Sequence, residues 1–140
     1  MSMKVLIVDL DHQFFNQARD LLESRGHHVL QEAHTDLALQ RAQAWRPDVV
    51  FVNAELADVA GGVFLAELES IRPRPAVVLT STLMRFDKAW QAWQHGGDEV
   101  LFKPLLQPSE LHVAVLTARK NTLLPRRRTT TGRALVRSAA

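Results

Sequence analysis

The chain has 140 residues, a formal net charge of +2 and no cysteine. This length fits one domain with a single hydrophobic core, and the lack of cysteine excludes disulfides, metal–thiolate sites and thiol catalysis. The apolar runs have the length of strands, and residues 1–10 do not resemble a signal peptide. We therefore expect no membrane span and a cytoplasmic protein.

The positive charge is concentrated near the carboxyl end. Residues 119–140 contain seven of the 17 Lys and Arg residues and no Asp or Glu, whereas residues 1–118 contain 10 basic and 15 acidic side chains. The body therefore carries a net charge of −5. Because the basic balance belongs to the tail, we do not expect nucleic acid to be the partner of the folded part.

The first half of the chain alternates strand and helix patterns. Residues 4–8 form an apolar strand, and residues 28–33 form a less apolar strand that we place nearer a sheet edge. Between them lies a helical pattern, with Asp11 as its expected N-cap. The next helical pattern begins near Thr35 and must end before Pro47, because a residue that precedes proline avoids the helical backbone.

The central strand is the element around which the chain is organised. Residues 49–52 form an unbroken, valine-rich run that is typical of a strand buried on both faces of a parallel sheet. Asn53 follows at its carboxyl end, where open α/β sheets place their ligand sites. The amide of Asn53 is therefore a candidate functional group.

The second half continues the same alternation. Residues 76–80 and 100–102 are predicted strands, and helices are predicted over residues 64–71 and 86–93, the latter with Trp90 and Trp93 as core residues. Pro108 suits the first turn of a last helix, whose predicted core stripe is Leu111, Ala114, Val115 and Ala118. Val113 and Leu116 fall outside that stripe, so we interpret them as candidates for a contact surface.

Five successive β-then-α units predict a parallel sheet with right-handed crossovers. The first βα turn reads Asp9-Leu10-Asp11 and lacks the glycine fingerprint of a dinucleotide site. The six histidines show no metal-ligand spacing, and we interpret them as surface residues: His12, His27, His28, His34, His95 and His112.

The ordered set of motifs resembles the receiver domain of bacterial response regulators, from about Lys4 to Lys120. The motifs are VLIVD ending at Asp9, RPD ending at Asp48, Gly61 before the third helix, Leu79-Thr80-Ser81, Gly96, and Lys103-Pro104. The resemblance implies a flavodoxin-like, doubly wound sheet of five strands in the order 2-1-3-4-5. We assign residues 1–120 to this domain and residues 121–140 to a basic, disordered tail or linker.

The resemblance also implies roles for individual residues. In that family an aspartate at the position of Asn53 accepts a phosphoryl group from a histidine kinase, and two adjacent acids help to hold Mg²⁺. Here Asp9 keeps the first acidic position, whereas Leu10 occupies the second. The resemblance places Thr80 and Lys103 in the phosphoryl-binding roles, implies a cis Lys103-Pro104 bond, and puts Val100 at the usual aromatic switch position.

The substitutions change the expected chemistry. An amide oxygen is a feeble nucleophile, so Asn53 offers no route comparable to an acyl phosphate. Mg²⁺ needs several oxygen ligands with negative charge, but Asp9 is the only family ligand side chain that remains. We expect Asp9 and Lys103 to form a direct ion pair, and we expect no catalytic residue, no cofactor, and weak or absent Mg²⁺ binding.

The first hypothesis is a degenerate receiver, or pseudo-receiver, of a two-component phosphorelay that is not an enzyme. It would signal by contact with another signalling protein or with itself, with a possible homodimer through the fourth helix, the fifth strand and the last helix. A second hypothesis is a phospho-accepting receiver with an atypical acceptor, for which the candidate carboxylates are Asp11, Glu55, Asp48 and Asp58. A third is a regulator that contacts nucleic acid weakly through its basic tail.

Overall fold

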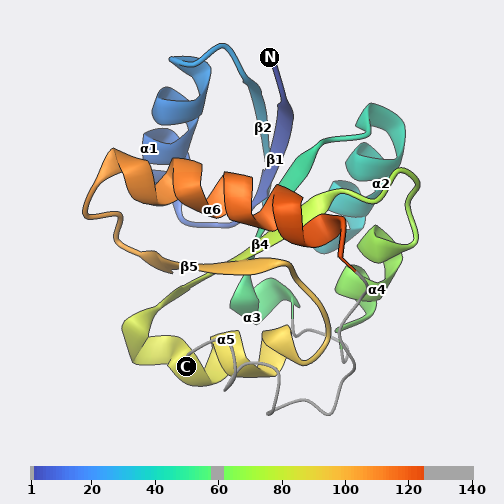
Figure 1. Cartoon of the computed structure of the whole chain (residues 1–140). Coiled ribbons are helices and arrows are strands. Elements are labelled where there is room, and N and C mark those ends of the chain that lie inside the picture. The colour runs from blue at the N-terminus through green and yellow to red at the C-terminus, as the bar shows by residue number, and fades with distance from the viewer. Residues whose placement is uncertain (1, 58–61, 125–140) are drawn as a thin grey trace.

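In the computed structural model, residues 2–57 and 62–124 are described. Their centre is a five-stranded parallel sheet with the order β2-β1-β3-β4-β5 (Figure 1). This confirms the predicted fold class and strand order. The strands are β1 (Lys4–Val8), β2 (His28–Glu32), β3 (Val49–Asn53), β4 (Ala76–Thr82) and β5 (Glu99–Lys103).

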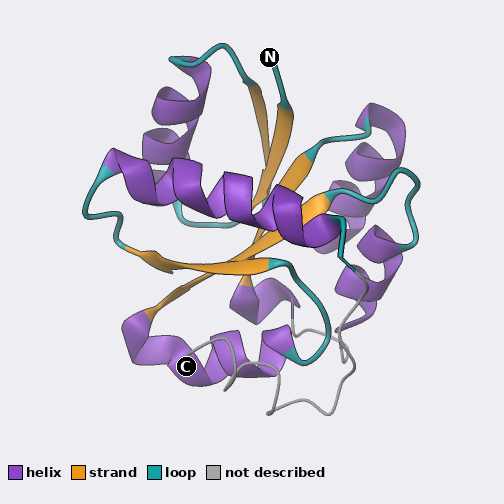
Figure 2. Ribbon diagram, viewed as in Figure 1, coloured by secondary structure: helices purple, strands orange, loops and turns teal. Residues whose placement is uncertain are grey.

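Helices cover both faces of the sheet (Figure 2). The core clusters divide them into two layers, with α1 and α6 on one face and the other helices on the opposite face. The helices are α1 (His12–Glu23), α2 (Thr35–Trp45), α3 (Ala54–Ala57), α4 (Val63–Glu69), α5 (Phe86–Trp93) and α6 (Pro108–Thr122), with a 3₁₀ turn η2 (Leu83–Arg85) before α5. Within the described ranges, no helix is both long enough and apolar enough to cross a membrane.

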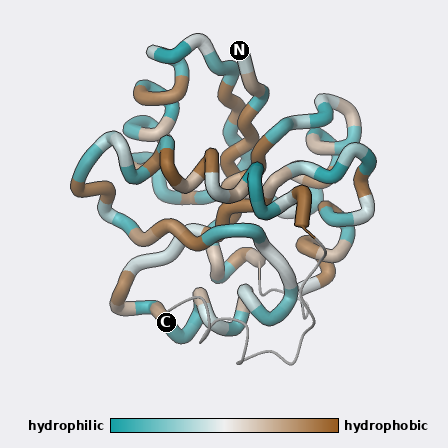
Figure 3. Tube along the Cα trace, viewed as in Figure 1, coloured by the Kyte–Doolittle hydropathy of each residue, from teal (hydrophilic) through white to brown (hydrophobic). Residues whose placement is uncertain are grey.

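The central strands are buried on both faces, as their apolar runs predict. Successive side chains of a strand point to opposite faces, so Val49 and Phe51 pack in the core beneath α1 and α6, whereas Val50 and Val52 pack in the core beneath α2 to α5. The hydropathy-coloured tube shows this concentration of hydrophobic positions in the central strands (Figure 3). Strand β2 lies at a sheet edge, as expected.

The predicted pattern of the last helix is confirmed. Its four predicted core residues are buried: Leu111, Ala114, Val115 and Ala118. Val113 and Leu116 are 57% and 68% exposed. Pro108 lies in the first turn, and a capping box joins Gln107 and Glu110 at the helix start. The helix ends at Thr122, two residues beyond the predicted domain boundary.

Three details of the prediction were wrong. The turn α3 directly follows β3 and was not predicted, because four residues are too few to show a helical period. Strand β4 continues to Thr82, two residues beyond the predicted end. The apolar pattern ends at Leu79, but pairing with β5 extends the strand as far as the Thr82–Lys103 pair. In α5, Trp90 is only half-buried, whereas Trp93 is in the core as predicted.

Candidate functional site

Four of the predicted site residues converge at the carboxyl edge of the sheet. Asp9 follows β1, Asn53 ends β3 and Lys103 ends β5. Thr80 is the register partner of Asn53 across the β3–β4 ladder. They meet because neighbouring parallel strands end at the same edge of the sheet.

Asp9 and Lys103 form the buried centre of the site. The Lys103 Nζ lies 2.9 Å from Asp9 Oδ2, and the two residues are only 8% and 2% exposed. The expected direct ion pair is therefore present. Removing one partner of such a buried pair leaves an uncompensated charge, which is costly even where the pair itself adds little net stability.

Asp11 is a second carboxylate partner of the lysine, which the sequence interpretation missed. Its Oδ1 accepts the Phe14 N–H at 3.0 Å, which confirms the predicted N-cap, while its Oδ2 lies 3.1 Å from Lys103 Nζ. The Phe14 hydrogen bond, helped by Lys103, holds the pKa of Asp11 below its usual value of 3.8. The expected balance of Asp9 alone against Lys103 was therefore wrong. No spacing rule could reveal the second contact, because the two residues are far apart in sequence.

Asn53 uses its side chain to cap the turn that follows it. The Asn53 Oδ1 accepts the Glu55 N–H at 2.9 Å, and this hydrogen bond fixes the orientation of the amide. The Nδ2 group consequently faces Asp9, 3.4 Å from Oδ1. A sequence signal for this cap exists: Asn53 is followed by Ala-Glu-Leu-Ala, which favours helix. The NH₂ group of Asn53 is a hydrogen-bond donor, and it therefore faces Asp9, the carboxylate to which the resemblance assigns a role in Mg²⁺ binding.

A cavity of about 420 Å³ opens above these residues. Thr80 does not line it, contrary to our expectation: it is fully buried, and its hydroxyl lies 3.4 Å from Asp9 Oδ2. Two other lining residues form an ion pair that no sequence motif predicted, with Arg85 Nη1 3.5 Å from Glu55 Oε1. The lining residues are Asp9, Leu10, Asp11, Asn53, Glu55, Leu56, Ser81, Thr82, Arg85 and Lys103.

These residues do not fit a Mg²⁺ site. Asp9 Oδ2 is taken by Lys103, and Asp9 Oδ1 accepts the Asp11 N–H at 3.0 Å. The Asn53 amide turns its NH₂ group, not its oxygen, toward that carboxylate. In the part of the chain that the structure describes, no cluster of three His, Asp or Glu side chains could hold a metal ion. Mg²⁺ requires several oxygen donors that are free to bind it.

Comparison with known proteins now gives the family. The model of the response regulator receiver domain matches residues 5–116. The chain belongs to the response regulator receiver domain family. Receiver domains are modules of two-component signalling that interact with other signalling proteins.

Relatives of this receiver domain occur in proteins of several sizes. The protein-glutamate methylesterase/protein-glutamine glutaminase 2 of Rhodospirillum rubrum is 32% identical over 121 residues, which cover 80% of this chain and 33% of that protein. The polar-differentiation response regulator DivK of Brucella anthropi is 26% identical and is covered to 89%, over 77% of this chain. The chain thus spans about a third of the first relative and most of the second.

The solved structures agree on the fold. The chemotaxis response regulator CheY4 of Vibrio cholerae superposes with a TM-score of 0.70 at 21% identity, and the match covers 84% of this chain and 99% of that one. A likeness at this level of identity shows the shared fold alone.

The remaining predicted positions of the receiver domain lie around the site. Leu10, at the second acidic position of the resemblance, is 61% exposed beside the cavity. Val100, at the switch position, is half-buried against the core beneath α2 to α5. The Lys103-Pro104 peptide bond is cis, as the resemblance implied. Gly61 and Asp58 lie outside the described residues.

Proposed function

We propose that this receiver domain is a pseudo-receiver: a module of a two-component phosphorelay that signals by protein contact without accepting a phosphoryl group. The observation that carries the proposal is the pairing at the site. The lysine that the resemblance assigns to the phosphoryl group is held by Asp9 at 2.9 Å and by Asp11 at 3.1 Å. The acceptor position holds Asn53, whose amide oxygen is used by the Glu55 N–H.

The chemistry supports this proposal in two ways. A neutral amide lacks the nucleophilic carboxylate oxygen from which an acyl phosphate forms. The carboxylate oxygens of Asp9 and Asp11 are already engaged by Lys103 and by backbone N–H groups, and Mg²⁺ needs several such donors, so we propose that the pocket works without a metal cofactor. The cytoplasmic location and the tail assignment of residues 121–140 stay predictions.

A second candidate is a receiver that accepts the phosphoryl group on another carboxylate. The observation that favours it is the position of Glu55 and Asp11, which both line the cavity with Lys103. Against it, Asp11 is already bonded to Phe14 and Lys103, and Glu55 is 3.5 Å from Arg85.

Acetyl phosphate separates the two candidates. We expect incubation of the full chain with acetyl phosphate and Mg²⁺ to leave its mass unchanged, as read by intact-protein mass spectrometry. The matched control is the Leu10→Asp/Asn53→Asp variant, which restores both missing carboxylates and should gain a hydroxylamine-labile phosphoryl group. Such an adduct on the unmodified chain would sink the proposal, and its loss in Glu55→Gln or Asp11→Asn would identify the acceptor.

A further inference from the structure

Strand β2 leaves one edge of the sheet open. It stands first in the order β2-β1-β3-β4-β5 and pairs with β1 on its inner side (Figure 1). Within residues 2–57 and 62–124, no strand pairs with its outer side. Such an edge is a template for a further strand, and native proteins commonly block it with lysine, proline or a bulge. The sequence of β2, His-Val-Leu-Gln-Glu, contains neither lysine nor proline, and its register with β1 runs without a bulge.

The backbone groups on the open edge belong to Val29 and Gln31. The His28 N–H donates to the Met3 carbonyl oxygen at 2.9 Å, and the Glu32 carbonyl oxygen accepts an N–H from the residue after β1 at 3.1 Å. These alternate residues of β2 are therefore used on the β1 side. Neighbouring residues of a strand direct their backbone groups to opposite sides, so Val29 and Gln31 present their N–H and C=O groups outward.

The side chains beside this edge form a groove on the α2 face. Leu30 packs against the core beneath α2 to α5, and His28 and Glu32 share its face because they lie two residues away on either side. A groove of about 460 Å³ lies between β2 and α2, and its apolar lining consists of Leu30, Leu37, Ala44 and Trp45. The edge thus offers a leucine with a histidine on one side and a glutamate on the other.

We infer that the open edge of β2 pairs with the same edge of a second copy, antiparallel and about a two-fold axis at Leu30. In this register Val29 lies opposite Gln31 of the second copy, and such a pair exchanges both of its backbone hydrogen bonds. Leu30 lies opposite Leu30 of the second copy. At each end the imidazole of His28 lies opposite the carboxylate of Glu32. The edge is therefore complementary to itself, as a two-fold interface requires.

Glu32 keeps the capacity for this contact although it already has a partner. Its Oε2 lies 2.9 Å from the Arg41 guanidinium. A carboxylate accepts several hydrogen bonds through its two oxygens. The Arg41 contact therefore holds the Glu32 side chain in place and leaves Oε1 for the imidazole of the second copy.

Neighbouring registers of the same edge are less favourable. A shift of the two-fold axis by one residue puts Leu30 opposite His28 or opposite Glu32 of the second copy. Either shift places an apolar side chain against a polar one and separates His28 from Glu32. Because directly opposed side chains are the unit of sheet stabilisation, the axis at Leu30 is the register that satisfies all three kinds of pair.

The other open edge of the sheet, along β5, lacks this complementarity. An antiparallel pair of β5 strands centred on Leu101 would need Glu99 opposite Lys103 of a second copy. Lys103 is 8% exposed, and its Nζ is already held by Asp9 and Asp11. Its charge is therefore not available at the β5 edge.

Pairing of one strand from each copy buries less than a standard interface, so we expect a reversible dimer that forms by about 1 mM protein. Light scattering of the full chain after size exclusion should show an average mass that rises toward two chains with concentration. His28→Glu should weaken the association about tenfold, because two carboxylates then face each other at both ends. His28 is exposed, so this variant should keep the melting temperature of the original chain.

Two further variants show whether charge at this position is the cause. His28→Glu/Glu32→His restores an unlike pair at both ends and should recover the association. Gln91→Glu is the matched control: it adds a carboxylate at an exposed position of α5 and should leave the association unchanged.

Disulfide trapping tests the register, because the chain has no cysteine of its own. The His28→Cys/Glu32→Cys variant should form a covalent dimer on mild oxidation, since directly opposed residues have Cα atoms about 4.5–5.5 Å apart. Either single variant and Gln91→Cys should stay monomeric. In a single variant the two thiols lie four residues apart along the strands, about 13 Å at 3.3 Å per residue, and a disulfide needs Cα atoms within about 7 Å. The same spacing prevents closure within one strand.

Three results would overturn the inference. One is a mass of one chain throughout the concentration series. Another is a dimer that His28→Glu leaves intact, which would place the contact elsewhere. The third is cross-linking of the His28→Cys single variant as efficient as that of the double variant, which would mean another register.

The inference rests on the proposed function, to which it adds the partner of the protein contact. Its failure would leave phosphorylation independence standing, because the acetyl phosphate assay does not depend on dimer formation. A phosphoryl adduct on the unmodified chain would conversely leave the pairing of β2 to be decided by the mass and cross-linking measurements.

Discussion

At the scale of single residues, the site is an ion cluster built on one lysine. Lys103 is held between Asp9 and Asp11, and its Nζ also lies 5.1 Å from the ring centre of Phe14. A lysine with two carboxylates and an aromatic face around it is well compensated for its burial. This arrangement gives the pocket a fixed charge distribution.

The neutral amide of Asn53 lies beside Asp9 without adding a negative charge to the Lys103 ion cluster. The Asn53→Asp variant tests whether this neutrality matters for stability. Asn53→Asp keeps the oxygen that caps α3 but turns the 3.4 Å contact with Asp9 into repulsion between two carboxylates. We expect a loss of roughly 1 kcal/mol in stability, seen as a melting temperature lower by a few degrees. Addition of Mg²⁺ should leave the melting temperature of the original chain unchanged.

The control for this prediction is the Leu10→Asp/Asn53→Asp variant. With a third carboxylate at the site it should bind Mg²⁺ measurably in calorimetry, and millimolar Mg²⁺ should raise its melting temperature. Tight Mg²⁺ binding by the unmodified chain would show that ligands other than these carboxylates act at the site.

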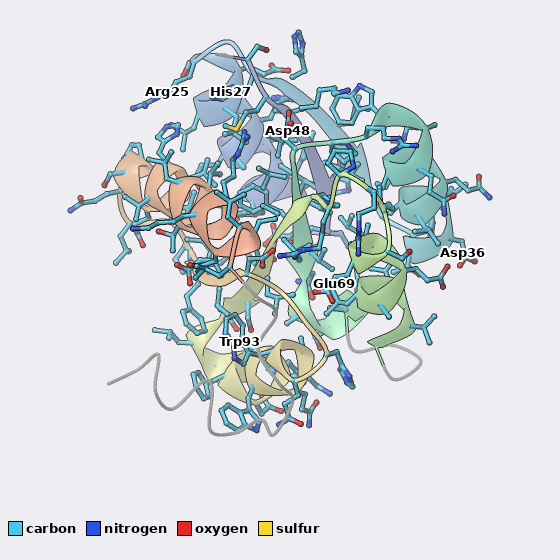
Figure 4. All side chains as sticks on the ribbon, turned by 45° about the vertical axis from the view of Figure 1, so that its right-hand side comes forward. Arg25, His27, Asp36, Asp48, Glu69 and Trp93 are labelled. Carbon is cyan, nitrogen blue, oxygen red and sulfur yellow. The ribbon has the colours of Figure 1, made fainter. Side chains whose placement is uncertain are left out.

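At the scale of elements, two histidines lie close to positive charges: His27 just before β2 and His112 in α6. His27 Nδ1 accepts the Met3 N–H at 3.0 Å, which requires an unprotonated nitrogen. Arg25 and His27 lie near each other at one end of the molecule (Figure 4). Burial, together with positive charges that include Arg25 and Arg119, lowers the pKa of His27 below 6.5, while Asp48 acts in the opposite direction. Burial, with Arg25 and His27, likewise lowers the pKa of His112 on α6.

These shifts predict how stability depends on pH. A histidine whose pKa is lower in the folded state binds fewer protons there than in the unfolded chain, so stability rises with pH. The contribution of His27 and His112 is complete above about pH 6.5 and is lost as the pH falls toward their lowered values. We expect the melting temperature to fall between pH 7 and pH 5, and to fall less in His27→Gln/His112→Gln. An equal slope in the original chain and the double variant would mean that other groups cause the pH dependence.

A link between elements fixes the far end of α6. Arg74 donates to both oxygens of Asp98, at 3.1 and 3.2 Å, and to the carbonyl oxygen of Thr122. Asp98 also accepts the Val77 N–H at 2.8 Å. The end of the helix is therefore tied to the starts of β4 and β5.

At the scale of the whole molecule, charge is divided between body and tail. Residues 1–118 carry a net charge of −5, and the following residues carry seven basic side chains without an acid. Because an aperiodic polar segment buries little apolar area, we expect truncation after Leu124 to leave the melting temperature nearly unchanged. Any affinity for polyanions should disappear with the segment and should weaken steeply with salt in the full chain. A truncated protein that unfolds would contradict this prediction.

The cut is placed after Leu124 because Leu123 and Leu124 are described residues that directly follow α6. Any protein contact made through the exposed Val113 and Leu116 should therefore survive the truncation. Loss of that contact on truncation, with an unchanged melting curve, would instead place the contact on the tail.

The sequence by itself determined the layers, the strand order and most of the site. Apolar runs and helical periods depend on local spacing, so they predicted five strands and the buried stripe of α6, and the family motifs predicted which residues meet at the carboxyl edge. Lys103 and Asp9 could be paired in advance because the family motifs place both at the carboxyl edge of the sheet. Val113 and Leu116 could be predicted as exposed because helix geometry alone excludes them from the core stripe.

Only the tertiary structure decided where the spare polar groups go. Asp11 looks like a helix cap in sequence, and its second oxygen reaches Lys103 only because the ends of β1 and β5 lie on the same side of the folded sheet. The NH₂ group of Asn53 likewise lies 3.4 Å from Asp9 Oδ1, although the two residues are 44 positions apart in the chain. Such contacts are determined by distances between segments remote in sequence, and a local pattern carries no information about those distances.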